Sequence, residues 1–328
     1  MQLIRLKRDT GGDLVGKEQE KKIIIVGTNE VTYQFAFLCM LKLKSVELLF
    51  YQLPLLEENK ILDLRFASSF SSSSSFAIAN VKDFLSTDLL VITASEERKP
   101  EESDDEYIRR NISLVRKIIK KAMSNGFSGL ILIATEPTDM FTYLVWKFSG
   151  LPKERIFGLG TFIDSTLFRK LLSKKLSVSS RDVNAFIVGG SSKDSKVTTW
   201  SRSNIGGNPI LSLMMDKKNN FSQNDRISIE SILSERELFA KEIDTYFTIV
   251  SALVKLTHFI FADEKALVTL MHLVDIDDLV NIPLSLPVLL GKDGIKVISK
   301  LGFSDSEKKE LTKVAKETRK YLDWIEKG

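Results

Sequence analysis

Short runs of apolar residues, each of strand length, recur along the first 190 positions of the chain. They lie at residues 23–26, 46–51, 89–92, 130–133 and 185–188. Runs that are apolar nearly throughout are typical of strands covered on both faces of a sheet. Amphipathic stretches separate them, the clearest with an apolar residue every three to four positions from Ile108 to Met123. This alternation predicts an α/β fold with a Rossmann-like, doubly wound parallel sheet over residues 21–160.

Two polar segments interrupt the pattern. Residues 1–20 are polar and show no period, so we expect a flexible leader or linker there. The Ser-rich stretch 68–75 is expected to form a polar loop between the second and third strands.

The pattern changes after residue 160. A capping box, with Glu307 three residues after Ser304, marks the start of a closing helix. Residues 161–328 are therefore expected to form a second, α+β domain that packs against the first. Its other predicted elements are a long helix over 227–260 and β-like segments at 266–274 and 282–291.

Composition narrows the class of protein. Hydrophobic residues make up 43% and charged residues 27%, which is typical of a globular chain, and the net charge of +4 is too small to indicate a nucleic-acid partner. No apolar run is long enough to predict a membrane span, so we expect a cytoplasmic protein. The single cysteine, Cys39, excludes a disulfide framework and a cysteine-based zinc site, and no metal is expected. The only histidines, His258 and His272, are both expected to be structural.

The first strand ends where a dinucleotide-binding loop would carry G-x-G-x-x-G. Here Gly27 is followed by Asn29 and Thr32 at the positions of the second and third glycines. Those glycines let the backbone approach a pyrophosphate and let the helix pack closely on the strand. At the end of the second strand, Gln52 stands where a carboxylate would bind ribose hydroxyls. By itself, this motif is too weak to identify a cofactor site.

Longer stretches resemble the lactate/malate dehydrogenase family, in order and at the family's spacing. They are residues 90–95, 110–111, 134–150, 158–169, 197–201 and 284–294. The resemblance implies a Rossmann-like domain over 21–160 followed by the family's C-terminal domain. It also implies a degenerate nucleotide site at Gly27, Asn29, Glu30, Val31, Gln52, Thr93, Ala94 and Glu136.

The resemblance also places the catalytic positions. Ser192 falls on the family's histidine, which an alcohol cannot replace as an acid and base near neutral pH. Asp104 falls on the arginine of the mobile loop, and Leu167 on the arginine that clamps the substrate carboxylate. Asp164 and Thr245 are retained as remnants, so no catalytic set is intact.

A branch of the family shares this pattern of loss. The dehydrogenase domain of ubiquitin-conjugating-enzyme variants looks similar in the first loop and at residues 196–201, although no ubiquitin-conjugating-like domain fits before residue 21. We therefore expect a pseudoenzyme that acts by binding. It should bind NAD weakly or not at all, and it should form a homo-oligomer or bind a protein partner. The alternatives are an NAD-dependent oxidoreductase acting on the CH–OH group of a non-standard substrate, and a nucleotide-responsive sensor.

Overall fold

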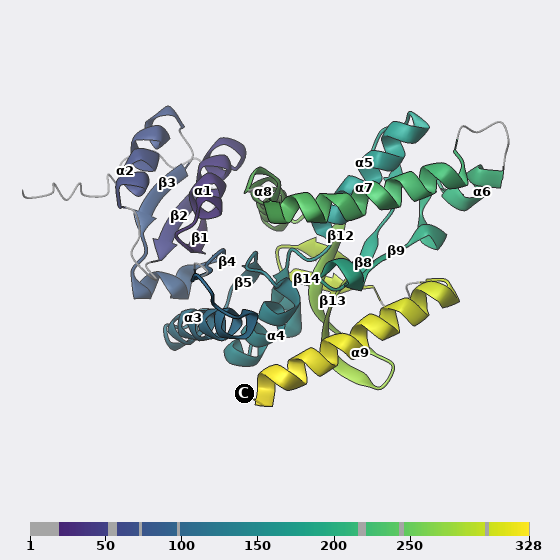
Figure 1. The fold of residues 1–328 in the computed structure, drawn as a ribbon. Helices are drawn as coiled ribbons and strands as arrows, with labels where there is room; N and C mark the ends of the chain where they lie inside the picture. Colours follow the sequence, from purple (N-terminus) through teal and green to yellow (C-terminus); the bar gives the residue numbers. More distant parts are fainter. Residues whose placement is uncertain are drawn as a thin grey trace, which may run out of the picture.

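The computed structural model describes residues 20–51, 58–71, 74–96, 99–215, 221–242, 246–298 and 302–327. Its first half is a parallel sheet in the order β3-β2-β1-β4-β5-β6 with helices between the strands (Figure 1). The strands are β1 (Lys21–Val26), β2 (Val46–Tyr51), β3 (Ser74–Ile78), β4 (Leu89–Ile92), β5 (Leu130–Ile133) and β6 (Ile156–Gly158). The helices are α1 (Glu30–Lys42), α2 (Glu58–Ala67), α3 (Asp104–Ser124) and α4 (Thr138–Ser149).

Alternate residues of the buried strands face opposite layers. In β1, Ile23 and Ile25 pack in the core that includes α1 and α8 (Tyr246–Phe261), whereas Ile24 and Val26 pack in the core beneath α3 and α4. All four side chains are fully buried. The sheet is thus covered on both faces, which confirms the doubly wound α/β architecture predicted from the apolar runs.

The second half continues the same sheet in antiparallel fashion. The hairpin of β12 (Ala266–Ile276) and β13 (Leu279–Gly291) joins β6 through Met271 and Gly158, and β14 (Gly294–Val297) pairs with β13. β8 (Ile187–Gly189) and β9 (Lys196–Thr198) extend the sheet beyond β13. A small sheet holds β7 (Val183–Asn184), β10 (Asn204–Ile205) and β11 (Asn208–Pro209). The remaining helices are α5 (Phe162–Leu176), α6 (Ile210–Met215), α7 (Gln223–Glu242) and α9 (Asp305–Lys327).

α9 begins as the capping box predicts. The backbone N–H of Ser304 donates to the Glu307 carboxylate at 2.9 Å, and the N–H of Glu307 donates to the Ser304 hydroxyl at 3.3 Å. The helix then runs along the lower edge of the molecule in Figure 1, across β13 and toward α4. α9 consequently packs against both the parallel and the antiparallel half of the sheet.

Three local expectations need correction. The Ser-rich segment is not a loop throughout, since β3 begins at Ser74 and pairs with β2 at the edge of the sheet. The Phe76 side chain of β3 is buried there. The strand predicted at 185–188 begins only at Ile187, as β8, and it pairs antiparallel with the C-terminal hairpin and β9. The long helix predicted over 227–260 is two helices, α7 and α8, separated by residues that lie outside the described part of the chain.

The predicted leader is outside the described residues, except for Glu20. Within the ranges that the structure describes, none of the helices has the length and apolar composition that crossing a bilayer requires.

Candidate functional site

The end of β1 meets the end of β4 through a pair of threonines. The hydroxyls of Thr32 and Thr93 lie 2.7 Å apart, and Thr93 also donates to the backbone carbonyl of Val26 at 3.1 Å. A Cβ atom on Gly27 would lie 2.2 Å from the Thr93 hydroxyl oxygen and 2.6 Å from that of Thr32. Thr32, in the first turn of α1, therefore packs its hydroxyl against the end of β4. It fills the space beside the remaining glycine.

Asn29 caps α1 with the oxygen of its side-chain amide, and the amide nitrogen binds the chain at the end of β4. Its Oδ1 accepts from the backbone N–H of Thr32 at 3.2 Å, and its Nδ2 donates to the Thr93 carbonyl at 2.7 Å. The side chain is thus held by the protein at the ends of β1 and β4, which are the two strands where the sheet order reverses. In open α/β sheets this crevice is where ligands bind.

The other predicted nucleotide positions surround the same crevice. Glu30, the first residue of α1, forms an ion pair with Lys60 at 2.6 Å. Val31 and Ala94 are buried, and the Ala94 carbonyl accepts from the Thr135 hydroxyl at 2.7 Å. Gln52 lies outside the described residues, so its predicted role stays a prediction.

A cavity of about 700 Å³ opens where α4 begins, beyond the carboxyl end of β5. Asp139 connects two of its walls, because its carboxylate accepts from the backbone N–H of Ser191 at 3.4 Å. The remaining wall is α9. The lining residues include Tyr107, Glu136, Pro137, Asp139, Ser191, Ser192, Ser195, Val314, Glu317, Thr318 and Tyr321.

Glu136 is the titratable group best suited to chemistry in this cavity. Its carboxylate accepts from the backbone N–H of Thr138 at 2.9 Å. Its side chain is exposed to the cavity but surrounded by protein on its other sides, and this withdrawal from bulk water raises its pKa to about 7. The negative charge of Asp139 also raises this pKa, whereas the hydrogen bond from Thr138 and the charge of Lys196 lower it.

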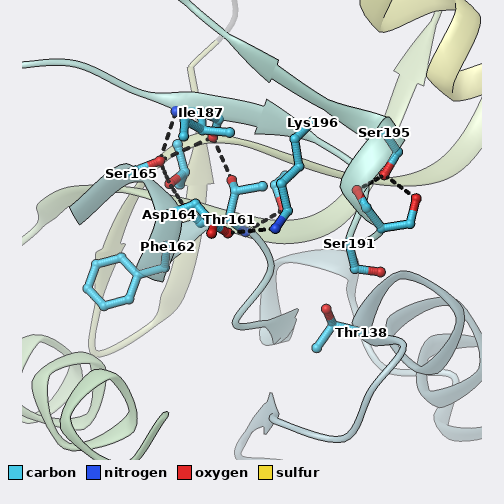
Figure 2. A network of polar contacts seen from close by, with 12 residues as sticks. Thr138, Thr161, Phe162, Asp164, Ser165, Ile187, Ser191, Ser195 and Lys196 are labelled. Atoms are coloured by element: carbon cyan, nitrogen blue, oxygen red, sulfur yellow. Dashed lines mark hydrogen bonds and ion pairs between the residues drawn. The ribbon is translucent and has the colours of Figure 1, made fainter. Parts of the chain in front are cut away.

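Asp164 is held in place by the anchoring of α5 to β8. Thr161 donates its hydroxyl hydrogen to the Ile187 carbonyl at 2.6 Å, and the Ser165 hydroxyl accepts from the Ile187 N–H at 2.9 Å (Figure 2). The Ser165 hydroxyl also lies 2.8 Å from that of Thr269 on β12. These bonds lie on either side of Asp164 in the sequence, and they fix the first turn of α5 against two strands.

The partner of Asp164 is a lysine. Nζ of Lys196, the first residue of β9, lies 3.1 Å from Oδ2 of Asp164, and the two side chains are only 16% and 7% exposed. Figure 2 shows the lysine side chain extending across to the start of α5. The pairing positions the Lys196 ammonium group at the first turn of α5. The role of Asp164 as a catalytic remnant stays a prediction.

Ser192 lies on the loop between β8 and β9. Its hydroxyl donates to that of Ser195 at 2.9 Å, and both residues line the Glu136 cavity. Leu167 follows Asp164 on α5 and is half-buried. The Asp104 backbone begins α3, but its side chain lies outside the description, as does the whole of Thr245.

Neither histidine belongs to this site. His258 forms an ion pair with Glu264 at 2.9 Å, and His272 is buried on β12. Reasoning from the sequence missed Lys196, which was noticed only within the stretch shared with one branch of a family. The available signal was a retained Asp164 whose expected partner was gone, since a buried carboxylate requires a compensating group.

Comparisons with known proteins cover nearly the whole chain. The family model described as lactate/malate dehydrogenase, NAD binding domain, matches residues 21–158. The model described as lactate/malate dehydrogenase, alpha/beta C-terminal domain, matches residues 161–327. The L-lactate dehydrogenases of Streptococcus gordonii and Streptococcus pneumoniae are each 32% identical over 318 residues, which is 94% of this chain and 96% of theirs.

Solved structures agree. A lactate dehydrogenase from a Medee basin deep-sea metagenome library is 29% identical, has a TM-score of 0.83, and matches 93% of this chain and 98% of its own. The lactate dehydrogenase of Cryptosporidium parvum, solved with lactic acid and nicotinamide adenine dinucleotide, also has a TM-score of 0.83. At 22% identity and with coverage of 94% and 99%, it shows the likeness of the fold alone.

Two expectations from the sequence are contradicted by these findings. The expectation of a pseudoenzyme is wrong, because relatives 32% identical over 94% of the chain are L-lactate dehydrogenases. The expectation of no or weak NAD is also wrong, because residues 21–158 match the family's NAD-binding domain. Both expectations were drawn from single motif positions that differ from the family. They took no account of residues from other parts of the chain that the fold brings to the same place.

Proposed function

Because the chain belongs to the lactate/malate dehydrogenase family, we propose that it is an NAD-dependent oxidoreductase that interconverts a secondary alcohol and a ketone. The observation that carries this proposal is the buried pair of Lys196 and Asp164. It supplies a positioned cation at the carboxylate that, in the family, orients the histidine. Charged groups held in place beside a cleft are typical of sites that perform chemistry, and this half-buried lysine is held in that way.

The residues at the sheet crossover fit a dinucleotide. The first N–H groups of α1 have no acceptor within the helix, and its positive end favours a phosphate. Glu30 would oppose a pyrophosphate, but its pairing with Lys60 offsets that charge. Gly27 and Ala94 leave small residues at the two strand ends. NAD bound there supplies a hydride acceptor, and NADH a hydride donor.

On the substrate side, we assign the proton to Glu136 and the positive charge to Lys196. Lys196 lines a neighbouring cavity of about 240 Å³ together with Asp164, but its charge reaches Glu136 and lowers the pKa of that carboxyl. A carboxyl with a pKa of about 7 is half-ionised near neutral pH, where it accepts or donates a proton with similar ease. Lys196 stabilises negative charge on the reacting oxygen, as preorganised donors do in other enzymes. Asp164 positions Lys196 and takes no part in the proton transfer.

The lining of the Glu136 cavity favours a neutral substrate over a carboxylate. Glu136, Asp139 and Glu317 all line it, and Leu167 stands at the family's clamp position. Burying an anion beside these groups without a bidentate arginine is costly. We therefore propose that the substrate lacks the carboxylate of lactate, which is the non-standard substrate considered from the sequence.

Two measurements on the purified full chain test the function. NADH fluorescence titration is expected to give saturable binding, and NADH oxidation is expected with methyl pyruvate or butanone as the ketone. Lys196→Met is expected to bind NADH and to lose turnover. No binding at about 1 mM NADH would overturn the cofactor assignment. Binding without turnover of any ketone in a broad neutral panel would overturn the oxidoreductase.

Two finer expectations join this proposal. We expect self-association, because members of this family pair through helices, and sedimentation of a species larger than 37 kDa would support it. Similarity to the domain fused to ubiquitin-conjugating-enzyme variants, a cytoplasmic location and the division at residue 160 remain predictions.

A further inference from the structure

A second cavity lies beneath α9, on the side of the C-terminal hairpin. Its volume is about 610 Å³, within the range of small-molecule sites in proteins. Leu311 and Thr312 of α9 line this cavity, whereas Val314 and Glu317, within the next two turns, line the cavity that holds Glu136. Its inner wall is mostly apolar and includes Leu286, Ile295, Phe303 and Leu311, with the exposed Val297 at its edge.

His272 belongs to the wall of this cavity. It lies opposite Leu284 in the hairpin of β12 and β13, and directly paired residues in an antiparallel sheet share a face. Leu284 packs in the core formed with Leu311 and Val314 of α9. The imidazole therefore projects toward α9, on the face where the cavity is found, and the residue is only 1% exposed.

The hydrogen bonding of His272 determines which nitrogen carries the proton. Nδ1 lies 2.8 Å from the carbonyl oxygen of Leu270, and a carbonyl only accepts, so Nδ1 is the donor. Nε2 then presents a lone pair. It is buried and has no hydrogen-bond partner among the described residues. A buried acceptor left unpaired destabilises the fold, and buried polar atoms in proteins are nearly always satisfied.

The rim carries charges of both signs. Lys153 pairs with Asp275 at 3.4 Å, Lys308 lies 3.8 Å from Asp305, and the Thr312 hydroxyl donates to Asp277 at 2.9 Å. With Glu154 also at the rim, positive and negative groups alternate, and no cluster of one sign selects an ion. Burial also lowers the pKa of His272 to about 4, so the ring is neutral at physiological pH and attracts no anion.

We propose that this cavity binds a small, neutral and mostly apolar molecule that donates one hydrogen bond, from a hydroxyl or an N–H group, to Nε2 of His272. The walls supply apolar contact, and the imidazole supplies the one directional contact, which a ligand reaches when the wall side chains that now cover His272 shift. This site is independent of the proposed oxidoreductase activity, since neither its walls nor its histidine takes part in that chemistry.

Phenol and anisole test the proposal as a matched pair, because they share a ring and only phenol donates. The chain has two histidines, so the full protein labelled with ¹⁵N-histidine gives two imidazole spin systems, and a His258→Gln variant assigns them. We expect phenol to shift the Nε2 resonance of His272 in a saturable way, to leave His258 unchanged, and to bind about tenfold more tightly than anisole. Saturating NADH is expected to leave the phenol effect intact.

A His272→Phe variant supplies the second test. Phenylalanine removes the acceptor while keeping a ring of similar size, so the variant is expected to fold and to bind the two probes equally by calorimetry. An unchanged Nε2 resonance with phenol, or equal shifts with phenol and anisole, would overturn the proposal. Tighter binding of phenol than anisole that persists in His272→Phe would overturn it too, because the donor would then be recognised elsewhere.

Discussion

Nζ of Lys196 lies 3.1 Å from Oδ2 of Asp164, and this contact joins the start of β9 to the first turn of α5. In the family that the chain belongs to, a histidine from the preceding loop is the partner of this aspartate. Here that loop presents Ser192, and the partner comes from four residues further along. A cation thus lies at the carboxylate for which the family resemblance predicts a histidine partner.

Replacing Lys196 is expected to separate catalysis from cofactor binding. Lys196→Met should lower kcat by about 100- to 1000-fold, because it removes a charge that stabilises the reacting oxygen. NADH affinity should change little, since Lys196 lies away from the end of α1. Steady-state kinetics with methyl pyruvate, alongside NADH fluorescence titration, measures both.

Lys22 supplies the matched control for Lys196. It pairs with Glu47 at 3.1 Å and its side chain is 19% exposed, close to the 16% of Lys196, but it lies in β1 at the opposite end of the strand from the crossover. Lys22→Met should therefore leave kcat unchanged. Equal loss of kcat in both variants would indicate a general effect on folding.

Glu136 is expected to govern the pH dependence of the reaction. Alcohol oxidation needs the ionised carboxylate, so kcat/KM should rise as the pH increases through about 7, and ketone reduction should fall over the same range. Glu136→Gln should be slow and should lose this step. A step of the same midpoint in the variant would assign the titration to another group.

Glu136 should also affect stability, with a sign that follows from its raised pKa. Between pH 4.5 and about 7, the folded protein holds a proton that the unfolded chain has lost. The free energy of unfolding contributed by this group therefore declines as the pH rises through that window. Urea unfolding at several pH values should show a shallower decline in Glu136→Gln than in the unmodified chain.

Leu167 is expected to set the preference between neutral and anionic substrates. Leu167→Arg places a guanidinium at the family's clamp position, where it can bind a carboxylate through two hydrogen bonds. The ratio of kcat/KM for pyruvate to that for methyl pyruvate should rise by at least about tenfold. Leu167→Met, which adds no charge, is the control and should leave the ratio as it was.

Asn29 should matter for stability more than the glycine pattern suggests. Asn29→Ala removes the cap of α1 and the bond to the Thr93 carbonyl, and should cost about 1 kcal/mol in urea unfolding. Asn29→Asp keeps the acceptor for Thr32 and should recover part of that loss. If Asn29→Ala is as stable as the unmodified chain, the side chain does not hold the crossover.

Much of the fold was predictable because burial on both faces leaves a local signature. The apolar runs at 23–26, 89–92 and 130–133 became β1, β4 and β5, and the Ser304–Glu307 box became the start of α9. The edge strand β3 was missed because only its inner face is buried, at Phe76, so its serines resemble a loop.

The sequence by itself determined the α/β class and the family, since each depends on residues close together or at fixed spacing. Only the tertiary structure decided that Lys196 forms an ion pair with Asp164, 32 positions away, and that Glu136 lies in a cavity that raises its pKa to about 7. Ion pairing and desolvation depend on distance in space and on the surrounding atoms. A motif read position by position contains neither, and for that reason the sequence alone led to the expectation of a pseudoenzyme.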